Sequence, residues 1–168
     1  MIIFGITMTA IVVVLTLLLV YSFGVGVLFG APYLPTMRVQ SKTALKLLDL
    51  KPGQTLYDLG CGDGRLLKLA AKQGINGVGY EMSPLLVLIA KINSFKYRKQ
   101  IKIIMANYWQ ADLSKADAVY VFLLDKYMSK FDKKIKSLNK PIKVASYTFK
   151  IPGKKPVASK AGVRLYYY

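Results

Sequence analysis

The stretch that most constrains the fold is "TLYDLGCGDGRLLKLAA", residues 55–71, in which three alternating glycines separate an apolar run from a helical pattern. Gly60, Gly62 and Gly64 can take positive φ angles and let a ligand approach the backbone closely. A loop of this kind between a strand and a helix is the usual ligand site of an open α/β sheet. We therefore expect an α/β domain with a small-molecule site at this loop.

Strand and helix patterns alternate along the chain, which is typical of an α/β protein with a mostly parallel sheet. Serine and proline at 83 and 84 mark a helix start, since serine caps and proline fits the first turn. The predicted helices are 41–50, with Ser41 as its cap, 64–74, 83–98 and 126–139. The predicted strands are 55–60, 76–81, 101–106, 117–124, 142–149 and 162–168. We expect a Rossmann-like three-layer sandwich with a shortened sheet, because few strands follow the last helix.

The N-terminal segment carries no charge before Arg38. Its apolar run, residues 2–29, exceeds the roughly 20 residues that a bilayer span requires. We predict a retained transmembrane helix within residues 1–30, a linker over 31–40 and the α/β domain over 41–168. A cleaved signal peptide is the alternative, but no basic residue precedes the run. The basic residues that follow the run predict a cytoplasmic position for the domain.

Composition narrows the function further. The net charge of +17, from 25 basic and 8 acidic residues, favours an anionic membrane surface, nucleic acid or an acidic protein as a partner. The predicted tether makes the membrane surface the first of these. The chain has no histidine and one cysteine, which excludes histidine-based catalysis and intrachain disulfides, and we expect no metal site.

Acidic residues near the glycine loop indicate the chemistry of its ligand. The loop departs from the G-x-G-x-x-G fingerprint and lacks the Lys-Ser/Thr pair of a phosphate loop. Asp63 would repel a pyrophosphate, so a ligand with a cationic amino group fits better. Glu81, at the end of the second strand, can accept both hydroxyls of a ribose, or it is a solvated carboxylate. An adenosine-bearing ligand that spans both strand ends satisfies these requirements.

"YDLGCGDGR" followed by "VGYE" resembles the first two motifs of class I S-adenosylmethionine-dependent methyltransferases. With "APYLPT", "GYEMSP", "ANYW", "ADAVYVFLL" and "KVASYTF", the chain is similar to the small protein-lysine methyltransferases over residues 32–149. That family includes archaeal broad-specificity enzymes and membrane-anchored mitochondrial enzymes that methylate the ATP synthase c subunit and the adenine nucleotide translocase. The resemblance implies S-adenosyl-L-methionine as cofactor and a methyltransferase domain over residues 41–168.

The resemblance also implies a set of cofactor-binding residues. Asp58 and the three loop glycines would line the methionine part, Glu81 would hold the ribose, and Asn107 would lie beside the adenine. The other expected contacts are Cys61, Met82, Tyr108 and Trp109, with a lid over the cofactor formed by Tyr33, Pro35 and Thr36. A plain core or surface aromatic is an equal alternative for Trp109.

The expected reaction is methylation of lysine side chains in a membrane-associated protein. Asp125 and Tyr147, at the predicted ends of the fourth and fifth strands, are the candidates for orienting the acceptor amine, and Asp125 could instead cap a helix. The segment "YTFKIPGKKP" departs from the family pattern on this side. Lipid or quinone methylation, RNA methylation and a non-catalytic membrane protein are the alternatives. The absence of an Asn/Asp-Pro-Pro-aromatic tetrapeptide counts against RNA.

Overall fold

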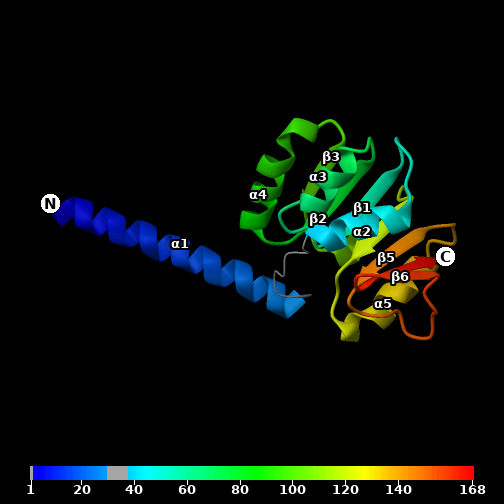
Figure 1. The fold of residues 1–168 in the computed structure, drawn as a ribbon. Coiled ribbons are helices and arrows are strands. Elements are labelled where there is room, and N and C mark those ends of the chain that lie inside the picture. Colours follow the sequence, from blue (N-terminus) through cyan, green and yellow to red (C-terminus); the bar gives the residue numbers. More distant parts are fainter. Residues whose placement is uncertain (1, 30–37) are drawn as a thin grey trace.

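The computed structural model describes residues 2–29 and 38–168, with the side chains of the first helix described at residues 4–17 and 20 (Figure 1). Among these residues the helices are α1 (Ile2–Phe29), α2 (Arg38–Leu48), α3 (Arg65–Ala71), α4 (Pro84–Ser94) and α5 (Asp125–Lys136), with single 3₁₀ turns η1 (Phe95–Tyr97) and η2 (Tyr108–Gln110). The strands are β1 (Thr55–Leu59), β2 (Asn76–Glu81), β3 (Ile101–Met105), β4 (Ala118–Val121), β5 (Lys143–Tyr147), β6 (Ala158–Lys160) and β7 (Val163–Tyr167).

The strands form one sheet in the order β3-β2-β1-β4-β5-β7-β6. β1 to β5 are parallel, whereas β7 runs antiparallel to both β5 and β6. The prediction of a mostly parallel α/β sheet is therefore confirmed. The prediction of a shortened sheet is wrong, because the sheet has seven strands and the sequence pattern revealed six. β6 escaped prediction because its three residues, "ASK", carry no apolar alternation.

Helices cover the two faces of the sheet unequally. Along β4, Ala118 and Tyr120 pack with residues of α2 and α3, whereas Val119 and Val121 pack with residues of α5. α3 contacts both α2 and α4, so these three helices form one layer (Figure 1). Within the described chain, the connection from β3 to β4 forms only the 3₁₀ turn η2. In this three-layer sandwich, α2, α3 and α4 thus cover one face of the sheet, and α5 is the main helix on the other face.

The predicted N-terminal cap is confirmed for α4 and wrong for α2. The side chain of Ser83 accepts a hydrogen bond from the amide of Leu86, 3.4 Å away, and Pro84 opens α4 as predicted. Ser41 was predicted to cap α2, but the helix begins at Arg38 and Ser41 is a fully buried residue inside it. The prediction failed because Arg38, Val39 and Gln40 carry no signal that distinguishes a helix from a linker.

α1 is a 28-residue helix that extends from the side of the domain that carries α4 (Figure 1). Its described apolar side chains, such as Phe4 and Leu17, are exposed. Nevertheless, among the residues that the structure describes, no helix meets the length and apolarity that a membrane span requires. The predicted transmembrane helix is therefore not supported by the structure.

Candidate functional site

The glycine loop turns sharply at the carboxyl end of β1. Gly60, Gly62 and Gly64 have φ angles of 88°, 55° and 74°, a region that favours glycine. The amides of Gly60 and Cys61 both donate to the carbonyl of Tyr80 at 2.9 Å, which ties the loop to β2. A Cβ at Gly64 would lie 3.2 Å from the Cβ of Ala90, so this glycine also permits α3 and α4 to pack closely. The positive φ angles predicted for the loop are confirmed.

Asp58 lies inside the site at the end of β1. Its side chain is 4% exposed, and no hydrogen bond to its carboxylate is found in the described part of the chain. Burial, with smaller contributions from Glu81 and Asp63, raises the pKa of Asp58 to about 8. A buried carboxyl of this kind favours a cationic partner, because a nearby positive charge stabilises its ionised form.

Asp63 does not act as the sequence suggested. Its carboxylate forms an ion pair with Arg65, with 2.7 Å between Oδ2 and Nη2. The Nε atom of Arg65 also donates to both carboxylate oxygens at 3.0 Å. Arg65 therefore offsets the charge of Asp63, and the preference for a cationic ligand depends on Asp58 and Glu81.

Glu81 ends β2 beside the loop, and its carboxylate is already engaged. Oε2 accepts from the amide of Gly62 at 3.0 Å, and Oε1 accepts from the amides of Met82 and Ser83 at 2.8 and 2.9 Å. A carboxylate offers roughly four acceptor positions. Since three are used, a ribose that donates both hydroxyls must replace at least one of these backbone bonds.

Asn107 follows β3 and lies close to Glu81. The register pairs Glu81 with Met105, and the amide of Ala106 donates to the carbonyl of Glu81 at 3.1 Å. The Oδ1 atom of Asn107 accepts from the amide of Trp109 at 3.0 Å, so this side chain caps η2. The structure thus brings Asp58, Glu81 and Asn107, from three adjacent strands, to one edge of the sheet.

Tyr108 and Trp109 lie toward the α5 side of the sheet. Tyr108 is buried, and burial, followed by Tyr127 and Glu81, raises its pKa to about 12. The indole of Trp109 packs against Tyr108 and Tyr127, with centroid distances of 5.1 and 6.0 Å. The Nζ atom of Lys130 lies 4.3 Å from the centroid of the indole. The contacts found for Trp109 are therefore those of a half-buried packing residue, one of its two expected roles.

Cys61 and Met82 flank the central residues of the site. A Cβ built at Gly79 would lie 2.6 Å from the Sγ atom of Cys61, so the thiol packs closely on β2. Burial is the main reason why the pKa of this thiol is raised. The contact found for Met82 is the bond from its amide to Glu81.

The candidate acceptor residues occupy different environments. Asp125 is exposed and is the first residue of α5, four positions beyond the end of β4, with Leu124 rather than Asp125 at the cap position. Tyr147 ends β5, is half-buried, and packs on Phe122 with a centroid distance of 4.8 Å. Sequence reasoning missed Thr148, whose φ of 68° is rare for a β-branched residue.

Thr148 is held in this conformation from several sides. The amide of Phe149 donates to the carbonyl of Tyr147 at 2.8 Å, which makes Thr148 the centre of a γ-turn. The amide of Thr148 donates to the carbonyl of Gly162 at 3.0 Å, and its carbonyl accepts from Arg164 at 2.6 Å. Strained backbone conformations of this kind are concentrated at functional sites. The sequence alone does not predict the conformation of Thr148, because it depends on the antiparallel pairing of β5 with β7.

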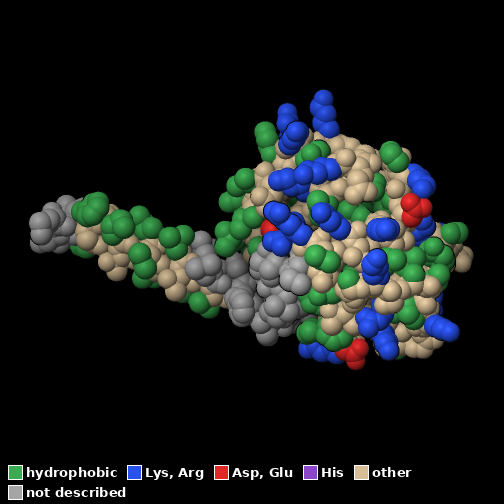
Figure 2. All heavy atoms as spheres, viewed as in Figure 1, with side chains coloured by type: hydrophobic (Ala, Val, Ile, Leu, Met, Phe, Trp, Pro, Cys, Tyr) green, Lys and Arg blue, Asp and Glu red, His purple; other side chains and the backbone are tan. Residues whose placement is uncertain are grey.

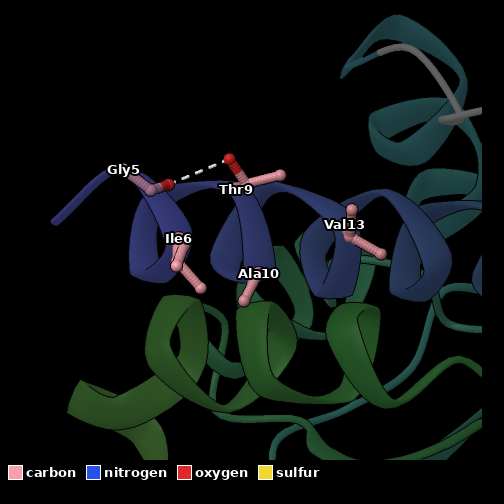
Figure 3. Close-up of a pocket in the computed structure, with 5 residues that line it drawn as sticks. All are labelled: Gly5, Ile6, Thr9, Ala10 and Val13. Atoms are coloured by element: carbon pink, nitrogen blue, oxygen red, sulfur yellow. Dashed lines mark hydrogen bonds between the residues drawn. The ribbon is translucent and has the colours of Figure 1, made fainter. Parts of the chain in front are cut away.

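Three predicted residues, Tyr33, Pro35 and Thr36, lie outside the described residues. A separate surface hollow on α1 is lined by Gly5, Ile6, Thr9, Ala10 and Val13 (Figure 3). Thr9 donates to the carbonyl of Gly5 at 2.9 Å, and none of the five residues can titrate. The hollow therefore offers no catalytic group.

Comparison with known proteins gives consistent matches. The model of the ANTKMT methyltransferase domain matches residues 58–158. A protein-lysine N-methyltransferase of Saccharolobus islandicus is 31% identical over 130 residues, which are 74% of this chain and 81% of that protein. The lysine N-methyltransferase of the ATP synthase c subunit from Xenopus laevis is 30% identical over 124 residues, 72% of this chain and 54% of that protein. The chain thus spans about half the length of the vertebrate relatives with this name.

A solved structure matches over nearly its whole length. The crystal structure of an RNA methyltransferase from Salinibacter ruber in complex with S-adenosyl-L-homocysteine has a TM-score of 0.73 and 28% identity. It covers 80% of this chain and 92% of that one. Further matches include a methyltransferase from Geobacter sulfurreducens in complex with the same compound, with a TM-score of 0.56 and 23% identity, over 71% of this chain and 53% of that chain.

Proposed function

This chain belongs to the family of the ANTKMT methyltransferase domain, and we propose that it uses S-adenosyl-L-methionine to methylate lysine side chains of a protein. The observation that supports the cofactor is the buried carboxylate of Asp58 beside Glu81 at the glycine loop. The observation that supports lysine is the similarity to the Saccharolobus islandicus protein-lysine N-methyltransferase over most of that protein's length.

The residues present fit the proposed cofactor. Asp58 would face the α-ammonium group of the methionine part, which supplies the positive charge that this buried carboxyl favours. Glu81 would accept from the ribose, with Asn107 beside the adenine on the next strand. Gly60, where a Cβ would meet no atom within 4 Å, leaves open space along the loop for the ligand. No metal takes part in this proposal.

When bound, S-adenosyl-L-methionine supplies a methyl group on a positively charged sulfur, so the chain mainly positions the acceptor. A lysine amine has an ordinary pKa of about 10.4 and must lose its proton before it can accept a methyl group. Burial next to a positive charge lowers the pKa of the amine. We assign Tyr147 and Asp125 to orienting the amine at the rim, at the carboxyl ends of β5 and β4.

The finer part of the proposal concerns where the substrate is found. We place the chain at a membrane, with its domain on the cytoplasmic side and a membrane-associated protein as its substrate. The exposed apolar side chains of α1 support this placement, as do the basic residues that follow from Arg38. Holding an enzyme near its substrate raises the effective concentration of that substrate.

RNA methylation is the second candidate. The similarity to the Salinibacter ruber RNA methyltransferase favours it, and so does the net charge of +17. The two candidates share the cofactor site and differ in the acceptor, so one experiment separates them.

The test is a transfer assay with the full chain and isotopically methyl-labelled cofactor. Membranes, soluble protein and RNA from the expression host are supplied together, and the label is then sought in protein, lipid and RNA fractions. Methyl-lysine in protein hydrolysates is the expected result. Label confined to RNA or lipid would overturn the lysine proposal but keep the methyltransferase.

Matched variants make the assay specific. Asp58→Asn should abolish both transfer and binding of S-adenosyl-L-homocysteine, measured by calorimetry. Asp49→Asn is the control, because Asp49 is exposed and pairs with Lys51. Full binding by the Asp58 variant would contradict the site assignment.

A further inference from the structure

The outer surface of α4 carries an apolar stripe whose side chains remain exposed in the described chain. Leu85, Leu88, Ile92 and Phe95 are 39%, 56%, 66% and 63% exposed. Their spacing of three or four residues places them on one side of the helix and its continuation η1. The opposite side of α4, which includes Val87 and Ala90, is buried against the domain. The helix is therefore apolar on both sides, although only one side packs in the core.

Basic side chains surround this stripe. Lys91 follows Leu88 by three positions, and Lys96 follows Ile92 by four, so both lie next to the stripe. The guanidinium of Arg98 lies 4.6 Å from the ring centroid of Phe95. Neither lysine has an ion pair in the described part of the chain. The long stems of such residues can cover apolar surface while their charges reach polar groups beyond it.

The whole layer that α4 shares with α2 and α3 is basic. Residues 38–48, 65–71 and 84–97 contain no aspartate or glutamate. Two acidic residues lie beside these helices, and each forms an ion pair, Asp49 with Lys51 and Asp63 with Arg65. The exposed basic residues on and directly beside these helices are Arg38, Lys42, Lys46, Lys72, Lys91, Lys96, Arg98 and Lys99. Lys and Arg side chains spread across the visible face in Figure 2, whereas Asp and Glu appear at few points. We refer to the α4 stripe and this basic layer together as the α4 face.

We propose that the α4 face docks onto an anionic lipid bilayer. Leu88, Ile92 and Phe95 would enter the boundary between headgroups and acyl chains, as the apolar side of an interfacial helix does. The surrounding lysines and arginines would meet the acidic headgroups, each contributing about 1 kcal/mol near such a surface. This inference does not depend on methyl transfer, and its test needs no activity.

Other occupants fit the α4 face less well. A second copy would bring two basic surfaces together, and their like charges would repel. Nucleic acid would satisfy the charges but would leave three exposed aliphatic side chains, Leu85, Leu88 and Ile92, without a matching surface. A bilayer satisfies both features at once. α1, whose described apolar side chains are exposed, also contacts α4.

The experiment uses the full chain with an environment-sensitive fluorophore on Leu88→Cys. Cys61 is buried, which directs the label to the new thiol. Vesicles of phosphatidylcholine with phosphatidylglycerol are compared with vesicles of phosphatidylcholine alone. We expect the label to enter an apolar environment with the anionic vesicles and to return to water as salt screens the charges. A label on Ser129→Cys, exposed on α5, should stay in water throughout.

Charge variants test the electrostatic part. Replacing Lys91, Lys96 and Lys99 by glutamine should weaken insertion of the residue 88 label about 100-fold, since each removed charge corresponds to about fivefold. Replacing Lys126, Lys130 and Lys133 on α5 by glutamine should leave insertion unchanged. Circular dichroism of both triple variants verifies that each is folded.

Four outcomes would overturn the proposal. The label could stay in water with both vesicle types, or respond equally to uncharged vesicles. A response to an RNA oligonucleotide without lipid would reassign the α4 face to nucleic acid. A response to protein concentration alone would reassign it to self-association.

Discussion

At the scale of single residues, the buried serines Ser41 and Ser146 allow a direct comparison of a hydroxyl without a hydrogen bond and one with a hydrogen bond. Both are fully buried, but only the hydroxyl of Ser146 has a partner, the carbonyl of Phe149 at 2.7 Å. The hydroxyl of Ser41 is buried without a hydrogen bond in the described structure. A buried polar group without a partner destabilises a fold by about 1–3 kcal/mol, whereas one satisfied bond stabilises it by about 1 kcal/mol.

We therefore expect Ser41→Ala to leave the free energy of unfolding unchanged or to raise it by up to about 1 kcal/mol. Ser146→Ala should lower it by about 1 kcal/mol and leave the carbonyl of Phe149 without its donor. Urea denaturation of the two variants measures both effects. A larger loss for Ser41→Ala than for Ser146→Ala would show that the hydroxyl of Ser41 has a partner in solution.

Asp58 links stability to pH. Its pKa is raised from 3.8 to about 8 in the folded chain, so between these values the folded state holds a proton that the unfolded state has lost. The contribution of Asp58 to the free energy of unfolding therefore decreases as the pH rises through that window. Asp58→Asn cannot ionise, so its melting temperature should exceed that of the wild type by more at pH 8 than at pH 5.

Thermal denaturation at the two pH values checks this expectation, with Asp49→Asn as the exposed control. An equal difference at both pH values would mean that Asp58 is ionised in the folded chain throughout. Together with the expected loss of cofactor binding, a stabilised Asp58→Asn variant would identify a carboxyl that is retained for the ligand rather than for the fold.

At the scale of elements, the contact between the glycine loop and β2 depends on Gly79. A Cβ there would lie 2.6 Å from the Sγ atom of Cys61 and 2.7 Å from Cδ1 of Leu67. We expect Gly79→Ala to destabilise the fold by about 1–3 kcal/mol, as overpacking does, and to weaken cofactor binding because the loop is displaced.

Gly153→Ala is the matched control for Gly79→Ala. Its φ is 68°, but a Cβ there meets no atom within 4 Å, so only backbone strain of about 1–2 kcal/mol applies. Unfolding experiments and titration with S-adenosyl-L-homocysteine distinguish the two variants. Equal effects of both substitutions on binding would remove the role assigned to Gly79.

The sequence predicted helices and strands well where the pattern of apolar and turn residues was regular. It predicted them poorly where the structure depends on pairing between strands. β2 was predicted to the residue, since "NGVGYE" lies between a turn and a capped helix. β6 and the γ-turn at Thr148 could not be predicted, because both depend on pairing with β7, a contact made across the sheet. The helix α5 begins at Asp125, one residue before its predicted start, because Asp125 extends the first turn instead of capping it.

The same contrast holds within the site. The positions of Asp58, Glu81 and Asn107 at one edge follow from the order of parallel strands, which the alternating pattern indicates. Two of the three backbone bonds of Glu81 come from the turn at Met82 and Ser83, and the third comes from Gly62 in the loop; the residue types of these segments do not reveal them. The pairing of Asp63 with Arg65, two residues away, removes Asp63 from the charge argument that was made for the loop and leaves that argument to Asp58 and Glu81.

At the scale of the whole molecule, a small cluster ties the last strand to α5. The hydroxyl of Tyr168 donates to Oδ1 of Asp132 at 2.6 Å, and Lys136 donates to the other carboxylate oxygen at 2.6 Å. The backbone of Tyr168 exchanges two hydrogen bonds with Ile142, at 3.0 and 3.2 Å. The antiparallel end of the sheet is thus joined to the layer opposite α3.

We expect Tyr168→Phe to lower the free energy of unfolding by about 1–3 kcal/mol, because the hydrogen bond that it removes has a charged acceptor. Tyr167→Phe is the control, since Tyr167 is half exposed. Chemical denaturation gives the difference. An equal effect of the two substitutions would show that the Asp132 cluster does not stabilise the domain.

The packing of Trp109 has a spectroscopic consequence. The chain contains one tryptophan, so its fluorescence reports on one place only, the connection between β3 and β4 where it packs against α5. The amide of Trp109 is bonded to Asn107, and its ring lies beside Tyr127 and the ammonium of Lys130. A ligand that displaces the Asn107 side chain removes the acceptor of the Trp109 amide, and we expect the indole to shift relative to that ammonium. The protein therefore carries an intrinsic optical probe at the edge of the site, and occupancy can be followed without a label.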